Sequence, residues 1–179
     1  MKKLKLEELG RISVEEFRQA EKLPVVIVLD NVRSLHNVGS AFRTSDAFKL
    51  EKIFLTGITG KPPHREIEKT ALGATSSVDW EYAQETTGLL RILKEKGYTI
   101  IAIEQTSESQ ELDHFHAVPG GRYCLIFGNE VHGVSEEAIA LADLAIEIPQ
   151  HGTKHSLNVS VCMGIVAWEF YKAIAAWKA

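Results

Sequence analysis

Residues 24–48, PVVIVLDNVRSLHNVGSAFRTSDAF, contain a strand, a polar loop and a helix in succession. Pro24 opens a β-branched apolar run of strand length that ends at Asp30. From Asn37 to Phe48, apolar residues recur at helical spacing. A strand that is apolar without alternation is typical of a parallel sheet buried on both faces. This stretch therefore predicts one strand and helix of an α/β sheet.

Apolar runs of strand length recur along the chain, separated by helical patterns. Apolar runs predict further strands at 52–57, 98–105, 122–128 and 144–149, with a weaker candidate at 77–83. Helical patterns fill 86–96, 135–141 and 157–177. Alternating strands and helices predict an α/β fold with one mainly parallel sheet and helices on both faces. Residues 1–22 form a short helical N-terminal extension, in which Ser13 and Glu16 match a capping box, and 23–179 form a single domain.

Composition narrows the class of protein. The 179 residues suit one domain, and 20 Lys+Arg against 24 Asp+Glu give a net charge of −4. This charge excludes a polybasic binder, so nucleic acid would need a local basic patch. Both cysteines lie in apolar runs, which favours a reducing compartment. The N-terminus lacks the apolar core of a signal peptide, and no apolar stretch approaches the roughly 20 residues of a membrane span. We expect a cytoplasmic protein.

The last predicted helix is apolar nearly all round. A helix of this kind is covered on more than one side, here by the sheet and either a second subunit or a lipid surface. We favour the subunit and expect a homodimer without membrane contact.

Three loops that follow predicted strands carry polar residues where ligands of α/β sheets bind. The first, 31–43, ends on the opening turns of a helix, although Asn37 as a plain N-cap and Arg43 as a solvated residue would also explain it. The second, 128–134, has glycine near both ends and Glu130 between, and an ordinary turn with a solvated glutamate is the alternative.

The third loop, 149–160, leads into the last helix. Ser156 can cap that helix, and Asn158 is expected just inside it, where a buried amide needs partners. His151 and His155 are four residues apart, and His114 and His116 two apart, but neither pair has cysteine or carboxylate at a zinc-like spacing, so we expect no metal. Phosphate-loop and GxGxxG motifs are absent, which argues against a nucleotidase or a Rossmann dehydrogenase.

Together the loops resemble the three motifs of the SpoU (TrmH) family of RNA ribose 2′-O-methyltransferases. The stretches are NVRSLHNVGSAFRTSDAF (31–48), LIFGNEVHGVSEEAIALAD (125–143) and IEIPQHGTKHSLNVSVCMGIVAWE (146–169), with KTALGATSSVDW (69–80) similar to the segment between the first two motifs. The resemblance covers about 25–172. It implies a C-terminal deep trefoil knot, S-adenosylmethionine as methyl donor, and a homodimer.

The resemblance also implies site residues. The catalytic positions are Asn37, Arg43, Glu130, Ser156 and Asn158. The cofactor-binding positions are Gly128, Asn129, Ile148 and Leu157, with Ile103 or Glu104 at the end of the fourth strand. Arg33, His36, Arg65, Lys154 and His155, with Lys61 and Lys69 nearby, form the expected RNA-binding surface.

The expected chemistry is in-line methyl transfer to a ribose hydroxyl. Because a guanidinium stays protonated, Arg43 is expected to clamp the target phosphate and stabilise alkoxide charge, with Asn37 holding it. Glu130 would pair with Arg43 or accept the proton, and Ser156 and Asn158 would orient the loop and the ribose. The short ends favour tRNA over rRNA. The alternatives are an RNA-binding protein of this fold that does not methylate, and a methyltransferase acting on a base nitrogen.

Overall fold

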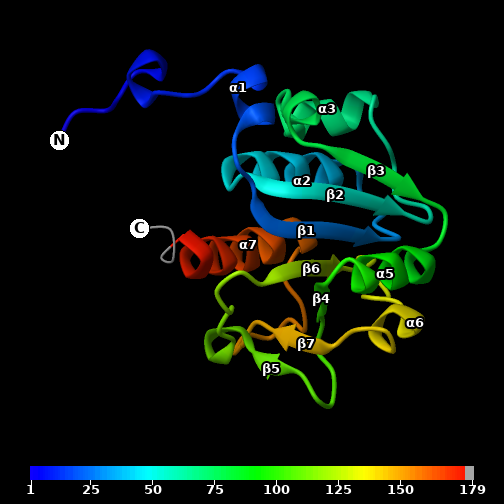
Figure 1. Ribbon diagram of the computed structural model, residues 1–179. Coiled ribbons are helices and arrows are strands. Elements are labelled where there is room, and N and C mark those ends of the chain that lie inside the picture. The colour runs from blue at the N-terminus through cyan, green and yellow to red at the C-terminus, as the bar shows by residue number, and fades with distance from the viewer. Residues whose placement is uncertain (176–179) are drawn as a thin grey trace.

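The computed structural model describes residues 1–175, which form one seven-stranded sheet (Figure 1). The strand order is β3-β2-β1-β6-β4-β7-β5, and every neighbouring pair is parallel. The strands are β1 (Leu23–Asp30), β2 (Leu50–Thr56), β3 (Trp80–Ala83), β4 (Tyr98–Ile103), β5 (Gln110–Glu111), β6 (Arg122–Phe127) and β7 (Leu144–Glu147). The six predicted strands and the parallel sheet are confirmed. Strand β5 was not predicted, because two residues are too few to show a pattern.

Helices cover both faces of this sheet, as predicted (Figure 1). Alternate residues of β1 enter two separate apolar clusters, one containing Val25 and the other containing Val26. The first cluster includes the buried sides of α2 (Leu35–Ala47) and α7 (Val159–Ala175), and the second includes that of α5 (Thr86–Glu95). Strand β1 is therefore apolar from Val25 to Leu29, because both of its faces are covered.

The helices differ from the expectation at their ends. Ser34 caps α2 by accepting the N–H of Asn37 at 3.3 Å, so the helix begins two residues before the predicted start. Helix α6 (Glu136–Ile139) is shorter than predicted, and α7 begins two residues later, while the last predicted helical residues, 176 and 177, lie outside the described residues. Three short elements were not predicted: α3 (Arg65–Ala71), α4 (Ala74–Ser77) and η2 (Leu112–His114). A further short element, η1 (Leu6–Leu9), lies within the predicted helical extension.

Helix α1 (Val14–Gln19) fastens the N-terminal residues to the domain. The predicted capping box is present, with Ser13 and Glu16 each accepting a backbone N–H of the other. Phe17 is buried in the first cluster, and the Arg18 guanidinium donates two hydrogen bonds to the carbonyl oxygen of Ser76. Residues before α1 extend away from the sheet (Figure 1). The division of the chain after residue 22 stays a prediction.

Helix α7 is buried on one side only. Met163, Val166 and Phe170 are almost fully buried, whereas Val161, Ile165 and Trp168 are 51%, 38% and 46% exposed. Within residues 1–175, no helix combines the length and the hydropathy that crossing a bilayer requires. The trefoil knot implied by the resemblance stays a prediction.

Candidate active site

The three polar loops leave the same edge of the sheet. Strand β6 lies beside β1, and β4 lies between β6 and β7. Since all strands are parallel, the loops after β1, β6 and β7 emerge together at the carboxyl ends of their strands. The fold thus brings the three predicted loops into one place.

The carboxylate of Glu130 joins the second loop to the first. One oxygen, Oε2, accepts the backbone N–H of Arg33, and the other, Oε1, accepts the backbone N–H of Ser34, each at 2.9 Å. Oε1 also accepts an Nδ2 hydrogen of Asn37 at 2.9 Å. Partial burial acts to raise the pKa of Glu130, but the hydrogen bonds from Arg33, Ser34 and Asn37 outweigh it and lower that pKa below its ordinary value. A carboxylate held in this way is a poor proton acceptor at neutral pH.

Asn37 continues the connection to the third loop. Its buried amide oxygen accepts an Nδ2 hydrogen of Asn158 at 3.3 Å. The oxygen of Asn158 in turn accepts the N–H of Ser160 at 2.9 Å and its hydroxyl at 2.6 Å, just before α7 begins. Asn158 therefore caps α7 from an exposed position, and the predictions that Ser156 caps it and that Asn158 is buried inside it were wrong. An N-cap side chain accepts a backbone N–H two or three residues ahead, and Asn158, directly before α7, accepts that of Ser160.

Arg43 stands apart from this chain of contacts. It is exposed on α2, and across residues 1–175 no hydrogen bond or ion pair joins it to Asn37 or to Glu130. The expected pairings of Arg43 with these two residues are therefore not present. Glu130 instead accepts from Asn37 and from the loop backbone, and Asn37 accepts from Asn158.

A cavity of about 520 Å³ opens between the second and third loops. Its lining includes all six residues expected to bind cofactor: Ile103, Glu104, Gly128, Asn129, Ile148 and Leu157. Three of the five expected catalytic residues, Glu130, Ser156 and Asn158, also line it, whereas Asn37 and Arg43 do not. One wall requires glycine, because a Cβ on Gly128 would lie 2.0 Å from the carbonyl carbon of Gly133.

Asn129 and Asn31 hold the second loop in shape. Backbone hydrogen bonds of 2.8 Å join Asn129 and Gly133 in both directions, and the side chain of Asn129 donates to the carbonyl oxygen of Asn31 at 2.8 Å. Asn31 has a φ of 56°, a conformation that asparagine adopts more readily than most residues. Sequence reasoning assigned no role to Asn31, although an asparagine directly after a buried strand was a usable signal.

Asp30, which sequence reasoning also missed, anchors the far end of the second loop. Its carboxylate is 1% exposed. It accepts the hydroxyl of Thr86 at 2.6 Å and both the N–H and the hydroxyl of Ser135, at 2.9 and 2.7 Å. These contacts fix the start of α6 against the end of β1.

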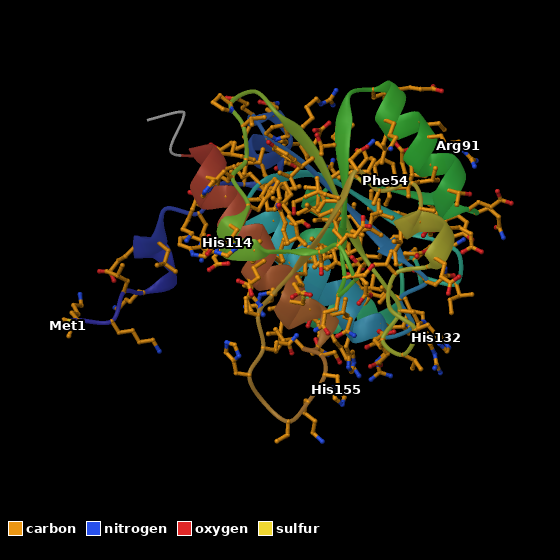
Figure 2. All side chains as sticks on the ribbon, turned by 90° about the horizontal axis from the view of Figure 1, so that it is seen from below. Met1, Phe54, Arg91, His114, His132 and His155 are labelled. Carbon is orange, nitrogen blue, oxygen red and sulfur yellow. The ribbon has the colours of Figure 1, made fainter. Side chains whose placement is uncertain are left out.

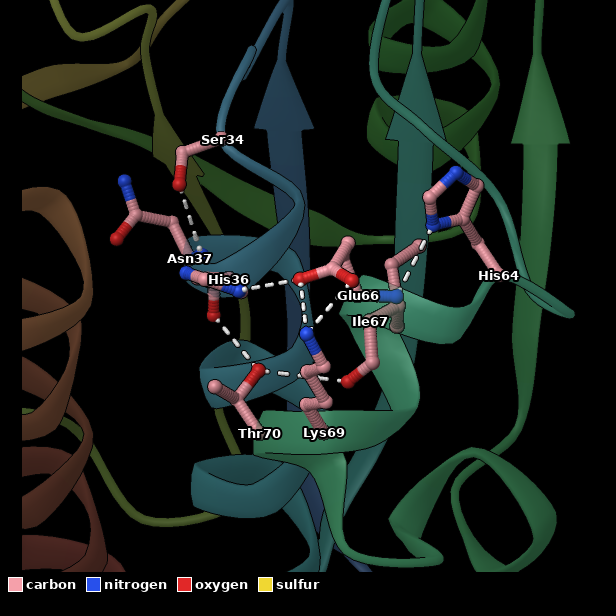
Figure 3. A network of polar contacts seen from close by, with 8 residues as sticks. All are labelled: Ser34, His36, Asn37, His64, Glu66, Ile67, Lys69 and Thr70. Atoms are coloured by element: carbon pink, nitrogen blue, oxygen red, sulfur yellow. Dashed lines mark hydrogen bonds and ion pairs between the residues drawn. The ribbon is translucent and has the colours of Figure 1, made fainter.

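The five residues expected to bind RNA are all exposed: Arg33, His36, Arg65, Lys154 and His155. His155 and His132 lie on the same side of the molecule (Figure 2). His36 is not free, because its Nε2 lies 3.0 Å from Glu66, which also accepts hydrogen bonds from Lys69 (Figure 3). Lys69 and then His36 lower the pKa of Glu66. Thr70, which lies on α3 with Glu66, links α3 to α2 by donating its hydroxyl hydrogen to the carbonyl oxygen of His36 at 3.0 Å.

The side chains that could together hold a metal ion lie outside the cavity. Within residues 1–175, one group of three potential ligand side chains comes close together, Glu111, Asp113 and His114, on exposed or half-exposed residues outside the cavity lining. Exposed acidic groups of this kind are common on protein surfaces without a metal.

Comparison with known proteins gives one consistent result. Residues 24–168 match the model of the SpoU rRNA Methylase family. A tRNA (guanosine(18)-2′-O)-methyltransferase of Thermus thermophilus is 33% identical over 90% of this chain and 81% of its own length. The structure of an A. aeolicus TrmH/SpoU tRNA modifying enzyme superposes with a TM-score of 0.82 at 27% identity, covering 92% of this chain and 84% of that one. The structure of an AdoMet-bound rRNA methyltransferase from Sinorhizobium meliloti superposes with a TM-score of 0.78 at 26% identity, covering 87% of this chain and 59% of that one.

Proposed function

This chain belongs to the SpoU rRNA methylase family, and from that premise we propose that it transfers a methyl group from S-adenosylmethionine to a ribose 2′-hydroxyl of structured RNA. The observation that carries the proposal is the meeting of three loops, distant in sequence, at the carboxyl edge of a parallel sheet, where the second and third loops line a cavity of about 520 Å³ and the first is bonded to both. The cavity volume is in the range of small-molecule and cofactor sites.

The lining of the cavity suits this donor. Ile103, Ile148 and Leu157 offer apolar surface for an adenine ring, and the backbone around Gly128 and Asn129 offers hydrogen-bonding groups without bulky side chains. When bound, S-adenosylmethionine supplies a methyl group on a positively charged sulfur, which is already activated for displacement. In the net reaction the 2′-oxygen gains the methyl group, the sulfur becomes a thioether and one proton is released.

Within this site the protein's task is alignment. Glu130 and Asn37 set the position of the first loop and of α2, which carries Arg43. Arg43, exposed and without a partner among residues 1–175, is available to bind the phosphate beside the target ribose and to stabilise charge on the 2′-oxygen. Ser156 and Asn158 line the cavity where the ribose would enter.

We further propose that the protein works as a homodimer. The exposed side of α7 presents Val161, Ile165 and Trp168 on one stripe. Trp168 is flanked by Phe48 and Tyr171, with ring centroids 5.9 and 5.7 Å away. A contiguous apolar and aromatic surface of this kind is typical of a subunit contact.

RNA is expected to approach over Arg33, His36, Arg65, Lys154 and His155. The relatives act on both tRNA and rRNA, and we favour tRNA because the T. thermophilus relative, matched over most of both chains, is named for a tRNA position. We also propose that residues 23–179 form the catalytic domain and that the protein works in the cytoplasm. The two unpaired cysteines support a reducing compartment.

The test uses the purified protein, S-adenosylmethionine with a deuterated methyl group, and total RNA from cells lacking the gene. The RNA is separated into tRNA and rRNA, digested to nucleosides and analysed by mass spectrometry. We expect label on a ribose 2′-oxygen, mainly in tRNA. Label on a base would favour a base methyltransferase, and binding of RNA with no label in any fraction would favour an RNA-binding protein that does not methylate.

A further inference from the structure

The cavity carries an uneven distribution of charge. Three carboxylates line it, those of Glu104, Glu130 and Glu147, while no lysine or arginine among residues 1–175 does so. The RNA substrate is an anion, so this charge does not serve RNA binding. It suits a ligand that carries positive charge.

Of these three, Glu104 is held in the cavity by the backbone alone. It follows β4 directly, and its carboxylate accepts the N–H of Val134 at 3.0 Å and that of Gln105 at 2.9 Å. In contrast, Glu130 has three N–H donors that tie the first loop, and Glu147 accepts the hydroxyl of Ser109 at 2.8 Å. In the described part of the chain, Glu104 thus has no partner of opposite charge and no side-chain hydrogen-bond donor.

The position of Glu104 is built into the second loop. Gly133 has a φ of 70°, which favours glycine, and a Cβ there would lie 2.2 Å from one of the carboxylate oxygens of Glu104 and would displace it. Across the cavity, burial first and the charge of Glu104 second raise the pKa of the Cys162 thiol to about 11. The charge of Glu104 therefore acts on the wall that α7 contributes.

We propose that Glu104 discriminates between the sulfonium donor and its thioether product by charge. This inference rests on the proposed function, since it assigns a selectivity to the same site. S-adenosylmethionine carries one positive charge more than S-adenosylhomocysteine, and the two are otherwise nearly the same shape. A cavity of about 520 Å³ is roughly 8 Å across, the cube root of its volume. We take this length, which is about one Debye length at physiological salt, as the separation between Glu104 and the charge of a bound ligand.

The size of the effect follows from Coulomb's law. Over roughly 8 Å, with an effective dielectric constant between about 80 and 20, one carboxylate favours the charged ligand by a factor of about 2 to 30. The neutral product gains nothing from this term. Once the methyl group has left, the cavity no longer holds the ligand by charge, and product release is favoured.

Calorimetric titration of Glu104→Gln tests the proposal. Glutamine keeps one oxygen that can accept the N–H of Val134, so the loop contact survives while the charge is lost. The measured quantity is the ratio of the dissociation constants for S-adenosylhomocysteine and S-adenosylmethionine. We expect this ratio to fall by about 2- to 30-fold in Glu104→Gln. Sinefungin, which carries an ammonium group in place of the methylated sulfur, is expected to follow S-adenosylmethionine.

The control is Glu95→Gln, which removes an exposed carboxylate that does not line the cavity. It is expected to leave the ratio unchanged. A purely structural role for Glu104 would weaken all three ligands equally, so a ratio within 1.5-fold of wild type would overturn the charge proposal. If the wild-type protein bound none of the three ligands, the proposed function itself would fail.

Discussion

Glu130 and Asn37, which are 93 residues apart in the sequence, are joined by a hydrogen bond of 2.9 Å. Asn37 extends the contact to Asn158 at the start of α7. One row of side chains thus connects all three loops of the site. The catalytic geometry depends on these polar contacts between loops as much as on the apolar core beneath them.

Replacing Arg43 with lysine is expected to reduce turnover by about 100-fold or more, because lysine keeps the charge but loses the planar fork that binds phosphate in two places. Binding of S-adenosylmethionine should be unchanged, since Arg43 does not line the cavity. Single-turnover methylation and calorimetry on the same variant measure the two effects. A near-normal rate would remove Arg43 from the chemistry.

Replacing Glu130 with glutamine is expected to make stability depend less on pH. The pKa of Glu130 is lowered in the folded protein, so its ionised form stabilises the fold at every pH above the unfolded value of about 4.3. This contribution is lost as the pH falls through the lower, folded pKa. Urea unfolding between pH 7 and pH 3 should show a stability difference between wild type and Glu130→Gln that is constant above about pH 4.3 and shrinks below it.

A charge-matched control for that experiment is Glu137→Gln, which removes an exposed carboxylate that has no hydrogen-bond partner in the described part of the chain. The control should follow wild type. If the difference for Glu130→Gln instead grew as the pH fell, the hydrogen bonds to its carboxylate would not be the cause.

Replacing Gly39 with alanine is expected to cost about 1–3 kcal/mol of unfolding free energy. A Cβ there would lie 2.1 Å from Oγ1 of Thr70 and 2.2 Å from the carbonyl oxygen of Ile67, so α2 and α3 would have to move apart. The matched change Gly88→Ala, in the open first turn of α5, should instead stabilise by about 0.5–1 kcal/mol. Chemical denaturation measures the unfolding free energy of both variants. If Gly39→Ala and Gly88→Ala changed it equally, the close packing of α2 on α3 would be contradicted.

Replacing Ser45 with alanine is expected to stabilise the fold by about 1 kcal/mol. The hydroxyl of Ser45 is fully buried and has no hydrogen-bond partner among residues 1–175. Ser77 is the comparison, because its buried hydroxyl donates to Asp46 and lies 3.2 Å from the carbonyl oxygen of Ala74. Ser77→Ala should destabilise. Loss of stability in Ser45→Ala would show that its hydroxyl has a partner in solution.

Replacing both Ile165 and Trp168 with glutamate is expected to turn the proposed dimer into a monomer, because both side chains are exposed on one stripe of α7. Light scattering after size-exclusion chromatography measures the mass, and circular dichroism checks the fold. Ile92→Glu, a charge placed on an exposed isoleucine of α5, should leave the mass unchanged. A wild-type protein that is monomeric at micromolar concentration would contradict the dimer.

The positions of β1, β2, β4 and β6 were predictable because a buried parallel strand is a continuous apolar run that can be recognised without its neighbours, whereas β3 has no buried residue and gave only a weak pattern. Helix α3 was not, because its seven residues carry only two buried side chains and depend on the packing of Gly39 against Thr70. The residues expected to bind cofactor all line one cavity, together with three of the five expected catalytic residues, while the roles of all of them stay predictions. The contacts between the site residues differ from the expectation. Arg43 was expected to pair with Glu130 because their charges are opposite, but the carboxylate of Glu130 accepts the backbone N–H groups of Arg33 and Ser34 instead, and a sequence pattern does not show such backbone donors.

The position of β6 beside β1 also has a consequence during synthesis of the chain. These neighbours in the sheet are separated by almost a hundred residues, and the last wall of the cavity comes from Val159 and Cys162 of α7. A ribosome-bound chain that has released only its first two strands cannot yet assemble a donor site. A fragment that ends before α7 lacks this part of the cavity lining, so we expect it to bind the methyl donor more weakly than the whole chain.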